Sequence, residues 1–76
     1  MKYHHYGQRL FALRCDMLLS QVDFGARVGI HQSQLSRFET GAQPVGARLI
    51  IRVAQRLGLD IVEELRIGGM LDERSE

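Results

Sequence analysis

The stretch SQVDFGARVGIHQSQLSRFETG, residues 20–41, contains two short helical patterns that are separated by a single glycine. Ser20 and Asp23 form a capping-box pattern, which predicts that a helix begins directly after the serine. Gly29 suits the left-handed conformation in which helices commonly end, so the first helix is predicted to span about residues 21–28. A second helix then follows almost at once.

The second half of the stretch, HQSQLSRFETG, predicts a helix with an unusually polar surface. Leu35 and Phe38 are its only apolar side chains, and their spacing places them on one narrow buried seam. Glutamine, serine and arginine occupy most other positions, and Gly41 ends the helix. A solvent-facing helix more typically carries glutamate and lysine, so these side chains indicate a surface that is presented to a hydrogen-bonding partner.

Two helices that cross at a steep angle through a tight turn need particular residue types, and this stretch supplies them in register. The first helix needs a very small residue where the second approaches, and Gly25 stands there. The turn needs a residue that tolerates positive φ, which is Gly29, and Ile30 then enters the core. This arrangement is a helix-turn-helix, in which the second helix lies in the major groove of DNA.

The flanking sequence adds three predicted helices and no predicted strand. Apolar residues at helical spacing predict one helix over about residues 6–17 and another over about residues 46–57. Asp60 and Glu63 form a second capping box, which begins a short helix that runs to about Leu65. The residues after it are expected to form a loose tail. We therefore predict an all-α fold whose helices pack at steep angles because the loops are brief.

The composition fits one small domain whose charge is unevenly distributed. The chain has 76 residues, of which 45% are hydrophobic, and a net charge of +1. Residues 1–59 carry eight basic and three acidic side chains, whereas residues 60–76 carry two basic and six acidic ones. A basic body suits a polyanionic partner, and an ordinary mixed surface explains the same charges equally well.

Other classes of protein lack support in the sequence. No apolar run approaches the roughly 18 residues that a membrane span needs, and the first ten residues do not match a signal peptide. A single cysteine, Cys15, indicates a reducing, cytoplasmic setting. His4, His5 and His31 lack partners at ligand spacing, so no metal or cofactor is expected. No nucleophile–base pair or phosphate-binding glycine loop points to an enzyme.

The chain resembles the Xre/Cro-like helix-turn-helix family of phage repressors and bacterial regulators. The similarity is carried by GQRLFALR (7–14), LSQVDFGARVGI (19–30), HQSQLSRFETG (31–41), Pro44 and LIIRVAQRLGL (49–59). It implies a compact five-helix, lambda-repressor-like domain over residues 1–66, followed by an acidic tail over residues 67–76. It also implies a transcriptional regulator that binds double-stranded DNA, usually as a homodimer on a two-fold-symmetric operator.

The resemblance also implies DNA-contacting roles for individual residues. The positions that contact base edges correspond to Gln32, Ser33 and Arg37. The positions that contact phosphates or sugars correspond to Gln21, Gln34, Ser36, Gln43 and Arg48. Because glutamine pairs bidentately with adenine and arginine with guanine, we expect a mixed site with at least one G·C pair under Arg37.

Other positions of the resemblance concern the scaffold of the domain. An arginine that ends helix one pairs with a glutamate that ends helix three in the family, and Arg14 and Glu39 match these positions. Leu18 stands where the family often has glycine, which implies a different end of helix one or an exposed apolar contact. His31 replaces the usual serine or threonine cap, and it either contacts a phosphate or is simply tolerated there.

The apolar residues of the last predicted helix have two interpretations. They either complete the core of a monomer or form a two-fold dimer interface, and they are Ile61, Val62, Leu65 and Ile67. Of an arginine stripe on the fourth helix, only Arg48 is expected near DNA, whereas Arg52 and Arg56 are expected to be solvated or at a subunit interface.

Two further features have a structural and a functional interpretation. Cys15 is expected to be a small buried apolar residue, and the alternative is a redox sensor. The segment with Lys2, Tyr3 and Tyr6 is either a partly ordered arm or a segment that lies along DNA.

Three functions are therefore compatible with the sequence. The first is a small DNA-binding regulator, similar in size to controller proteins of restriction-modification systems and to Cro-like repressors, whose further partners are RNA polymerase or a regulatory protein. The second is a DNA-binding antitoxin whose hydrophobic C-terminal segment binds a toxin. The third is a protein-interaction module that has lost DNA binding, which the polar residues of the predicted recognition helix disfavour.

Overall fold

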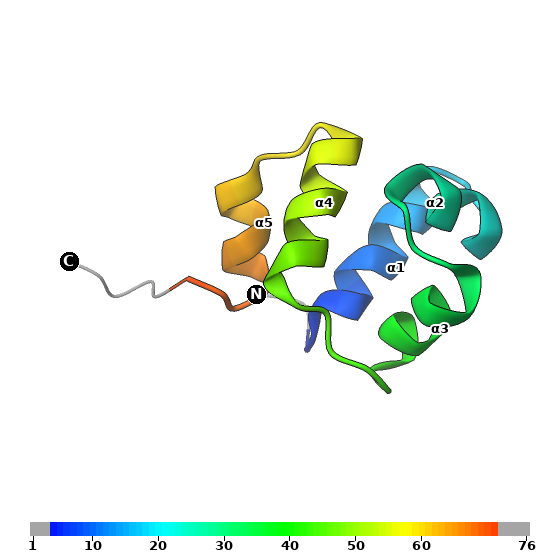
Figure 1. The fold of residues 1–76 in the computed structure, drawn as a ribbon, viewed down its shortest axis with the longest axis horizontal. Coiled ribbons are helices and arrows are strands. Elements are labelled where there is room, and N and C mark those ends of the chain that lie inside the picture. The colour runs from blue at the N-terminus through cyan, green and yellow to red at the C-terminus, as the bar shows by residue number, and fades with distance from the viewer. Residues whose placement is uncertain (1–3, 72–76) are drawn as a thin grey trace.

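The computed structural model describes residues 4–71 and contains five α-helices joined by short connections (Figure 1). The helices are α1 (Tyr6–Asp16), α2 (Gln21–Val28), α3 (Gln32–Thr40), α4 (Ala47–Leu57) and α5 (Ile61–Ile67). No strand occurs among the described residues. The predicted all-α fold of five helices is confirmed.

The local signals of the central stretch act as predicted. The Ser20 hydroxyl accepts a hydrogen bond from the amide of Asp23, 3.1 Å away, and begins α2. Gly29 ends α2 and Gly41 ends α3, both in the left-handed conformation. Positive φ is accessible to glycine without the steric cost that a Cβ imposes, which explains why both helices stop at these residues.

The predicted ends of two other helices differ from the structure by one or two residues. α1 ends at Asp16, one residue before its predicted end, and Met17 follows as its C-cap. α5 continues to Ile67, two residues beyond Leu65, because the amide of Gly68 still bonds to the carbonyl of Glu64 at 3.0 Å. Ile67 also packs against the core, so tertiary contact extends this helix into the predicted tail.

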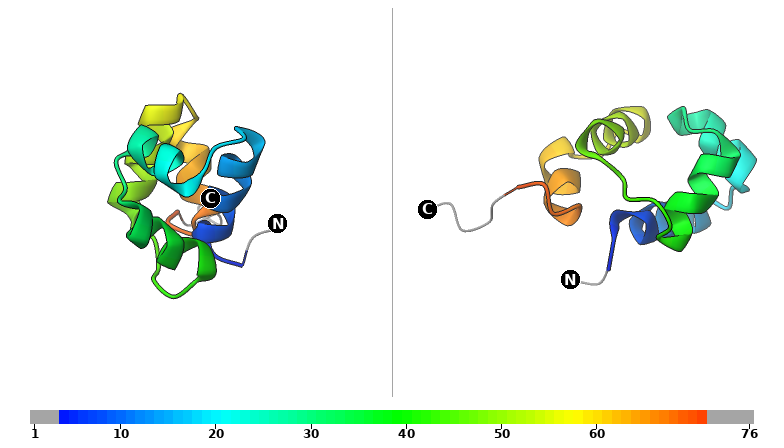
Figure 2. Two further views of the ribbon diagram at one scale, coloured as in Figure 1. Left: turned by 90° about the vertical axis from the view of Figure 1, so that its right-hand side faces the viewer. Right: turned by 60° about the horizontal axis from the view of Figure 1, so that its bottom comes forward.

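The helices pack as two groups that meet through α2 and α4. α3 contacts both α1 and α2, while α5 contacts α4, and α2 touches α4 between them. Figure 1 shows α4 and α5 side by side, with α2 and α3 on the opposite side of the molecule, and the right-hand view of Figure 2 shows α5 and α3 at opposite ends. α3 therefore lies at one end of the molecule, far from α5.

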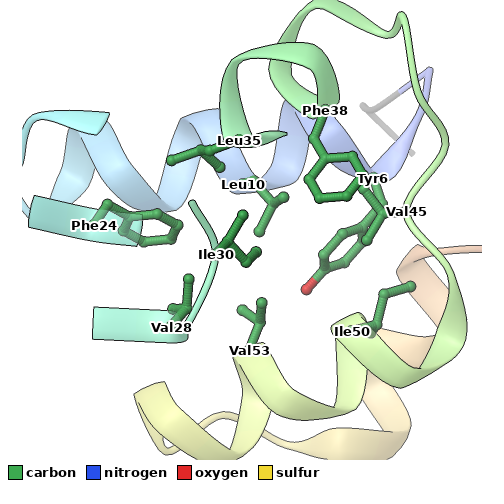
Figure 3. Packing of buried hydrophobic residues seen from close by; sticks show 10 residues of the cluster. All are labelled: Tyr6, Leu10, Phe24, Val28, Ile30, Leu35, Phe38, Val45, Ile50 and Val53. Atoms are coloured by element: carbon green, nitrogen blue, oxygen red, sulfur yellow. The ribbon is translucent and has the colours of Figure 1, made fainter. Parts of the chain in front are cut away.

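One hydrophobic cluster holds the groups together (Figure 3). Its members come from α1 to α4 and the connections between them, and they are Tyr6, Leu10, Phe24, Val28, Ile30, Leu35, Phe38, Val45, Ile50 and Val53. Leu35 and Phe38 form the predicted seam of α3. α1 approaches α3 very closely at Gly7, where an added Cβ would lie 1.7 Å from the carbonyl oxygen of Phe38.

Two expectations about α1 are wrong. Cys15 is exposed, because the buried face of α1 passes through Tyr6 and Leu10 and the cysteine lies on another face of the helix. Tyr6 begins α1 and is buried, so it does not belong to an N-terminal arm. Lys2 and Tyr3, the other residues of that segment, lie outside the described residues.

A buried carboxylate joins α5 to α1. Glu64 is only 2% exposed and accepts hydrogen bonds from the Tyr6 hydroxyl at 2.7 Å and from Nε and Nη2 of Arg9 at 3.0 and 2.6 Å. Burial disfavours the charged form, but the hydrogen bonds from Arg9 and Tyr6 outweigh it and hold the pKa of Glu64 below its usual value. Burial, together with the neighbouring carboxylate, raises the pKa of Tyr6. The sequence analysis did not identify this cluster.

Two arginines of α4 stabilise the end of α2, although they are exposed. Arg52 donates to the carbonyl oxygen of Gly29 at 2.8 Å, and Arg56 donates to that of Arg27 at 3.4 Å. Both side chains are exposed, as one of the two expected alternatives requires, but the sequence analysis did not predict these contacts, which form because carbonyls at a helix C-terminus attract cations. Across the described part of the chain, every helix is too short or too polar to cross a membrane.

Candidate nucleic-acid interface

The turn between α2 and α3 depends on a close backbone approach at Gly25. The amides of Gly29 and Ile30 both donate to the carbonyl of Gly25, at 2.7 and 2.8 Å. A Cβ added at Gly25 would lie 2.2 Å from the carbonyl oxygen of Ile30, which is far inside van der Waals contact. Gly29 adopts φ of 79°, and Ile30 is buried directly after the turn. This is the predicted helix-turn-helix geometry.

α3 is held by its apolar seam and presents its polar face outward. Leu35 and Phe38 are buried, whereas Gln32, Ser33 and Arg37 are exposed. Gln32 and Ser33 lie in the first turn of α3, and Arg37 lies one turn beyond Ser33 on the same face of the helix. The three side chains that were expected to contact bases are therefore all accessible.

An ion pair fixes the C-terminal half of α3 to α1. Nε and Nη2 of Arg14 donate to the two carboxylate oxygens of Glu39 at 2.8 and 3.0 Å, and Nη1 donates to the carbonyl of Leu19 at 3.1 Å. The side chains of Arg14 and Glu39 are only 16% and 6% exposed. The hydrogen bond to Glu39 raises the pKa of Arg14. The guanidinium also lies 5.3 Å from the centre of the Phe11 ring.

Gln21 links Glu39 to the exposed face of α3 by two hydrogen bonds. Nε2 of Gln21 donates to Oε1 of Glu39 at 3.0 Å, and Oε1 of Gln21 accepts from Nε2 of Gln32 at 2.9 Å. Arg14, Glu39, Gln21 and Gln32 therefore form a continuous chain of hydrogen bonds, which we call the Arg14–Gln32 chain. The sequence analysis paired Arg14 with Glu39 but gave Gln21 and Gln32 separate roles at DNA, because their contacts depend on how α1, α2 and α3 cross.

A second polar contact joins α3 to the loop that follows it. Nε of Arg37 donates to Oε1 of Gln43 at 3.1 Å, so an expected base-contacting residue meets an expected phosphate-contacting one. Of the other residues expected at the DNA backbone, Gln34 and Ser36 are half-buried on α3, and Arg48 is exposed in the first turn of α4.

His31 occupies the N-cap position of α3, as the resemblance implied, but the sequence analysis did not predict that its side chain caps the helix. Its Nδ1 accepts a hydrogen bond from the amide of Ser33 at 3.2 Å and also lies 3.0 Å from the Ser33 hydroxyl oxygen. The available signal was the position of His31 directly before a helix, where a side-chain acceptor is usually found.

Leu18 carries a left-handed conformation that is rare for a branched residue. Its φ is 59°, and its side chain is 91% exposed. The position thus has the backbone conformation that glycine adopts freely, which explains why the family often has glycine there. Of the two expected alternatives, the structure shows the exposed apolar side chain.

The apolar residues of α5 divide into two kinds. Leu65 and Ile67 are half-buried and pack against the core, which supports the interpretation that they complete the monomer. Val62 is 55% exposed, and Met70 and Leu71 are also exposed beyond the helix. Ile61 is half-buried. Within residues 4–71 no group of three histidine, cysteine, aspartate or glutamate side chains is placed to hold a metal ion.

Comparison with known proteins identifies the class to which this fold belongs. A family model described as helix-turn-helix matches residues 10–63, which include the turn at Gly29 and most of the five helices. The chain therefore belongs to the Xre-like helix-turn-helix family. The predicted family is confirmed.

A more specific similarity is found to one bacterial protein. The chain is 38% identical over 61 residues to the uncharacterized HTH-type transcriptional regulator y4dL of Sinorhizobium fredii (strain NBRC 101917 / NGR234). The match covers 80% of this chain and 31% of that regulator, so the chain spans about a third of the length of its relative. No solved structure matches the chain.

Proposed function

We propose that the protein is a sequence-specific DNA-binding transcriptional regulator that places α3 in the major groove. The family and the name of the relative support regulation of transcription at the level of the class. The observation that carries the proposal is the Arg14–Gln32 chain, because it gives the amide of Gln32 a defined direction at the surface of α3. A merely solvated side chain needs no such support.

The direction of the Gln32 amide follows from the charge at the buried end of the chain. An ionised Glu39 can only accept hydrogen bonds, so Gln21 must offer its amide nitrogen to Glu39 and keep its oxygen for the next partner. Gln32 must then donate from its nitrogen to Gln21. Gln32 is left with its carbonyl oxygen and one N–H for a partner outside the protein.

These two free groups of Gln32 match adenine. In the major groove adenine presents the N6 amino donor beside the N7 acceptor, whereas guanine presents two acceptors. The carbonyl oxygen of Gln32 would be repelled by O6 of guanine. We therefore place an adenine under Gln32, with a preference of about 1–3 kcal/mol over the wrong base, which is roughly 5- to 150-fold in affinity.

Arg37 is the second base-contacting residue of the proposal. Its contact with Gln43 uses Nε, which leaves the terminal Nη donors for guanine O6 and N7. Gln43 then positions the guanidinium in addition to facing the DNA backbone. Ser33 is the third base-contacting residue, on the same exposed face of α3.

The DNA backbone is proposed to be contacted at both edges of α3. Gln21 begins α2, so its main-chain amide and its remaining side-chain N–H face a phosphate at a helix N-terminus. Gln34 and Ser36 on α3, and Gln43 and Arg48 after it, supply the other backbone contacts. Because these contacts neutralise or bind phosphates, affinity for DNA should fall steeply as the salt concentration rises.

We also propose a homodimer on a two-fold-symmetric operator. The exposed side chains of Val62, Met70 and Leu71 lie at the α5 end of the molecule, and a second copy would cover them. Ile61, Leu65 and Ile67 add their half-buried surfaces to this patch. Two recognition helices must then lie about 34–36 Å apart, which is one turn of DNA.

The antitoxin interpretation differs from this proposal only in what covers the α5 end. Val62→Asp should convert a dimer into a monomer in sedimentation experiments, while Val22→Asp, at an exposed valine on α2, serves as the control. A wild-type chain that is monomeric at every concentration would exclude the homodimer and favour a different protein as the partner of this patch.

Selection of binding sites from random DNA tests the central proposal. The wild type should yield sites with an adenine and a guanine at fixed positions in each half-site. Gln32→Ala should relax the choice at the adenine alone, and Arg37→Ala at the guanine alone. Gln55→Ala, an exposed glutamine on α4, is the control and should change neither. Failure to recover any preferred sequence with the wild type would refute the proposal.

A further inference from the structure

An apolar groove lies between α2 and the start of α3, beside residues that are proposed to contact DNA. Val22 and Ala26 are four residues apart on one face of α2, and both are exposed, Val22 by 61%. Ile30, directly after the turn, lines the groove below them, and His31 and Gln32 line it from the start of α3. The aliphatic side chains of α2 are therefore open to a partner.

The chemistry of the groove selects an uncharged, apolar group. None of the described side chains that line it carries a carboxylate, an ammonium or a guanidinium group. The polar atoms at its edge already have partners, since Nε2 of Gln32 donates to Gln21 at 2.9 Å and Nδ1 of His31 accepts from the amide of Ser33 at 3.2 Å. A group that enters the groove therefore gains contact with aliphatic carbon more than hydrogen bonds.

The groove is continuous with the proposed DNA interface. Gln21, directly before Val22, is proposed to face a phosphate, and Gln32 is proposed to contact adenine. The groove thus lies between a contact with the DNA backbone and a contact with a base edge. Among the groups that a pyrimidine presents in the major groove, C5 lies nearest to the backbone of its own strand, and in thymine C5 carries a methyl group.

We infer that this groove receives the 5-methyl group of a thymine at a base pair beside the adenine under Gln32. The inference rests on the proposed function, since it adds a second site of base recognition next to Gln32. Thymine presents an apolar group in the major groove, and proteins recognise its methyl group by apolar contact. Val22 is then a base-contacting residue that lies on α2, outside the recognition helix.

The first arm of the test replaces thymine by uracil in a site selected from random DNA. Uracil keeps O4 and its pairing with adenine, and it lacks only the 5-methyl group. Each thymine of one half-site is replaced in turn, and the affinity is measured by fluorescence anisotropy. A thymine beside the adenine under Gln32 should lose about four-fold in affinity on replacement, which is the effect of burying one methyl-sized group.

The second arm removes the apolar wall of the groove from the protein. Val22→Ser replaces two methyl groups by one hydroxyl at an exposed position, so the fold should be retained, as thermal unfolding followed by circular dichroism verifies. This variant should lower the preference for thymine over uracil to below about two-fold. Gln55→Ala, at an exposed glutamine of α4, is the control and should keep the wild-type preference of about four-fold.

A third arm supplies the same methyl group on a different base. A C·G pair is placed at the thymine position, and cytosine is compared with 5-methylcytosine. The wild type should bind the methylated site about four-fold more tightly, because the methyl group occupies the same place in the major groove. Val22→Ser should bind the two sites with nearly equal affinity. A wild type that does not distinguish them would contradict an apolar contact with the methyl group.

The outcomes distinguish this inference from the proposed function. Specific binding without a thymine beside the adenine, or with one that uracil replaces at no loss, would refute the inference alone and favour an apolar protein side chain as the occupant of the groove. A loss on uracil that persists unchanged in Val22→Ser would also refute it, because DNA shape would then account for the effect. Absence of specific binding by the wild type would refute the proposed function and the methyl site with it.

Discussion

Replacement of Glu64 by glutamine tests how much the buried carboxylate between α5 and α1 stabilises the fold. The substitution preserves the size of the side chain and one carbonyl oxygen, which can still accept from the Tyr6 hydroxyl. The other oxygen becomes an amide nitrogen, which is a donor. It would face Nη2 of Arg9, also a donor, where the structure has a 2.6 Å ion pair.

The expected loss follows from the burial of the two charges. Removing one partner of a buried ion pair costs about 3–5 kcal/mol, because the remaining charge loses its compensation. Arg9 is 20% exposed, can recover some hydration and does not depend on Glu64 alone, so we expect the lower end, about 3 kcal/mol. For a domain of this size each kcal/mol lowers the melting temperature by about 4–8 °C. The variant should therefore melt about 12–24 °C below the wild type.

The neighbouring residue provides a matched control for this measurement. Glu63 is the same residue type on the same helix, and it pairs with Arg66, but its side chain is 49% exposed. Glu63→Gln should cost less than about 1 kcal/mol, since exposed ion pairs contribute little. Thermal and urea unfolding followed by circular dichroism at pH 7 measures both variants. Equal stabilities of Glu64→Gln and Glu63→Gln would refute the reasoning.

Three further substitutions or conditions test other parts of the fold. Below the pKa of an unfolded glutamate, about 4.3, the wild type should lose stability more steeply with falling pH than Glu64→Gln. Folding lowers the pKa of Glu64, so the stability that its carboxylate contributes disappears as the carboxylate protonates. Parallel acid unfolding curves of the two proteins would contradict this. Leu18→Gly should raise the free energy of unfolding by about 0.5–1 kcal/mol, because relief of the strain in the left-handed backbone exceeds the entropy that glycine adds to the unfolded chain. Leu18→Ala keeps the strained backbone and should change the free energy of unfolding little. Gly25→Ala should lower the free energy of unfolding by about 3 kcal/mol or more, since the added Cβ would meet the carbonyl of Ile30. Gly46→Ala, with open space around it, should lower it by no more than about 1 kcal/mol. Similar melting temperatures for the two alanine variants would argue against the close approach at Gly25.

The local features of the chain were predictable because their signals are local. Ser20 caps α2, Asp60 caps α5, and Gly29 and Gly41 end their helices as the sequence indicates. Each depends on a hydrogen bond or a backbone conformation within a few residues of the chain. The narrow seam of Leu35 and Phe38 was equally predictable, since helical periodicity alone places both side chains on one face.

The wrong expectation about Cys15 and the contacts that the sequence did not reveal occur where a residue's environment depends on distant segments. Cys15 lies near apolar neighbours in the chain, but α1 turns it toward solvent. Glu64 follows another glutamate in an acidic segment, and only the contact of α5 with α1 buries it between Tyr6 and Arg9. Arg52 lies in a regular stripe of arginines, and the crossing of α4 over the end of α2 gives it a carbonyl to bind.

The candidate interface likewise divides into features set by local sequence signals and features set by contacts between distant segments. The sequence by itself determined five helices, a tight turn at Gly29 and a polar face on α3, because capping, positive φ and periodicity act over short distances along the chain. Only the tertiary structure decided that Glu39 touches Gln21 and that Gln21 touches Gln32, residues that lie 18 and 11 positions apart. The direction of a side-chain amide depends on its hydrogen-bonding partners in space, and the crossing of α1, α2 and α3 brings those partners together.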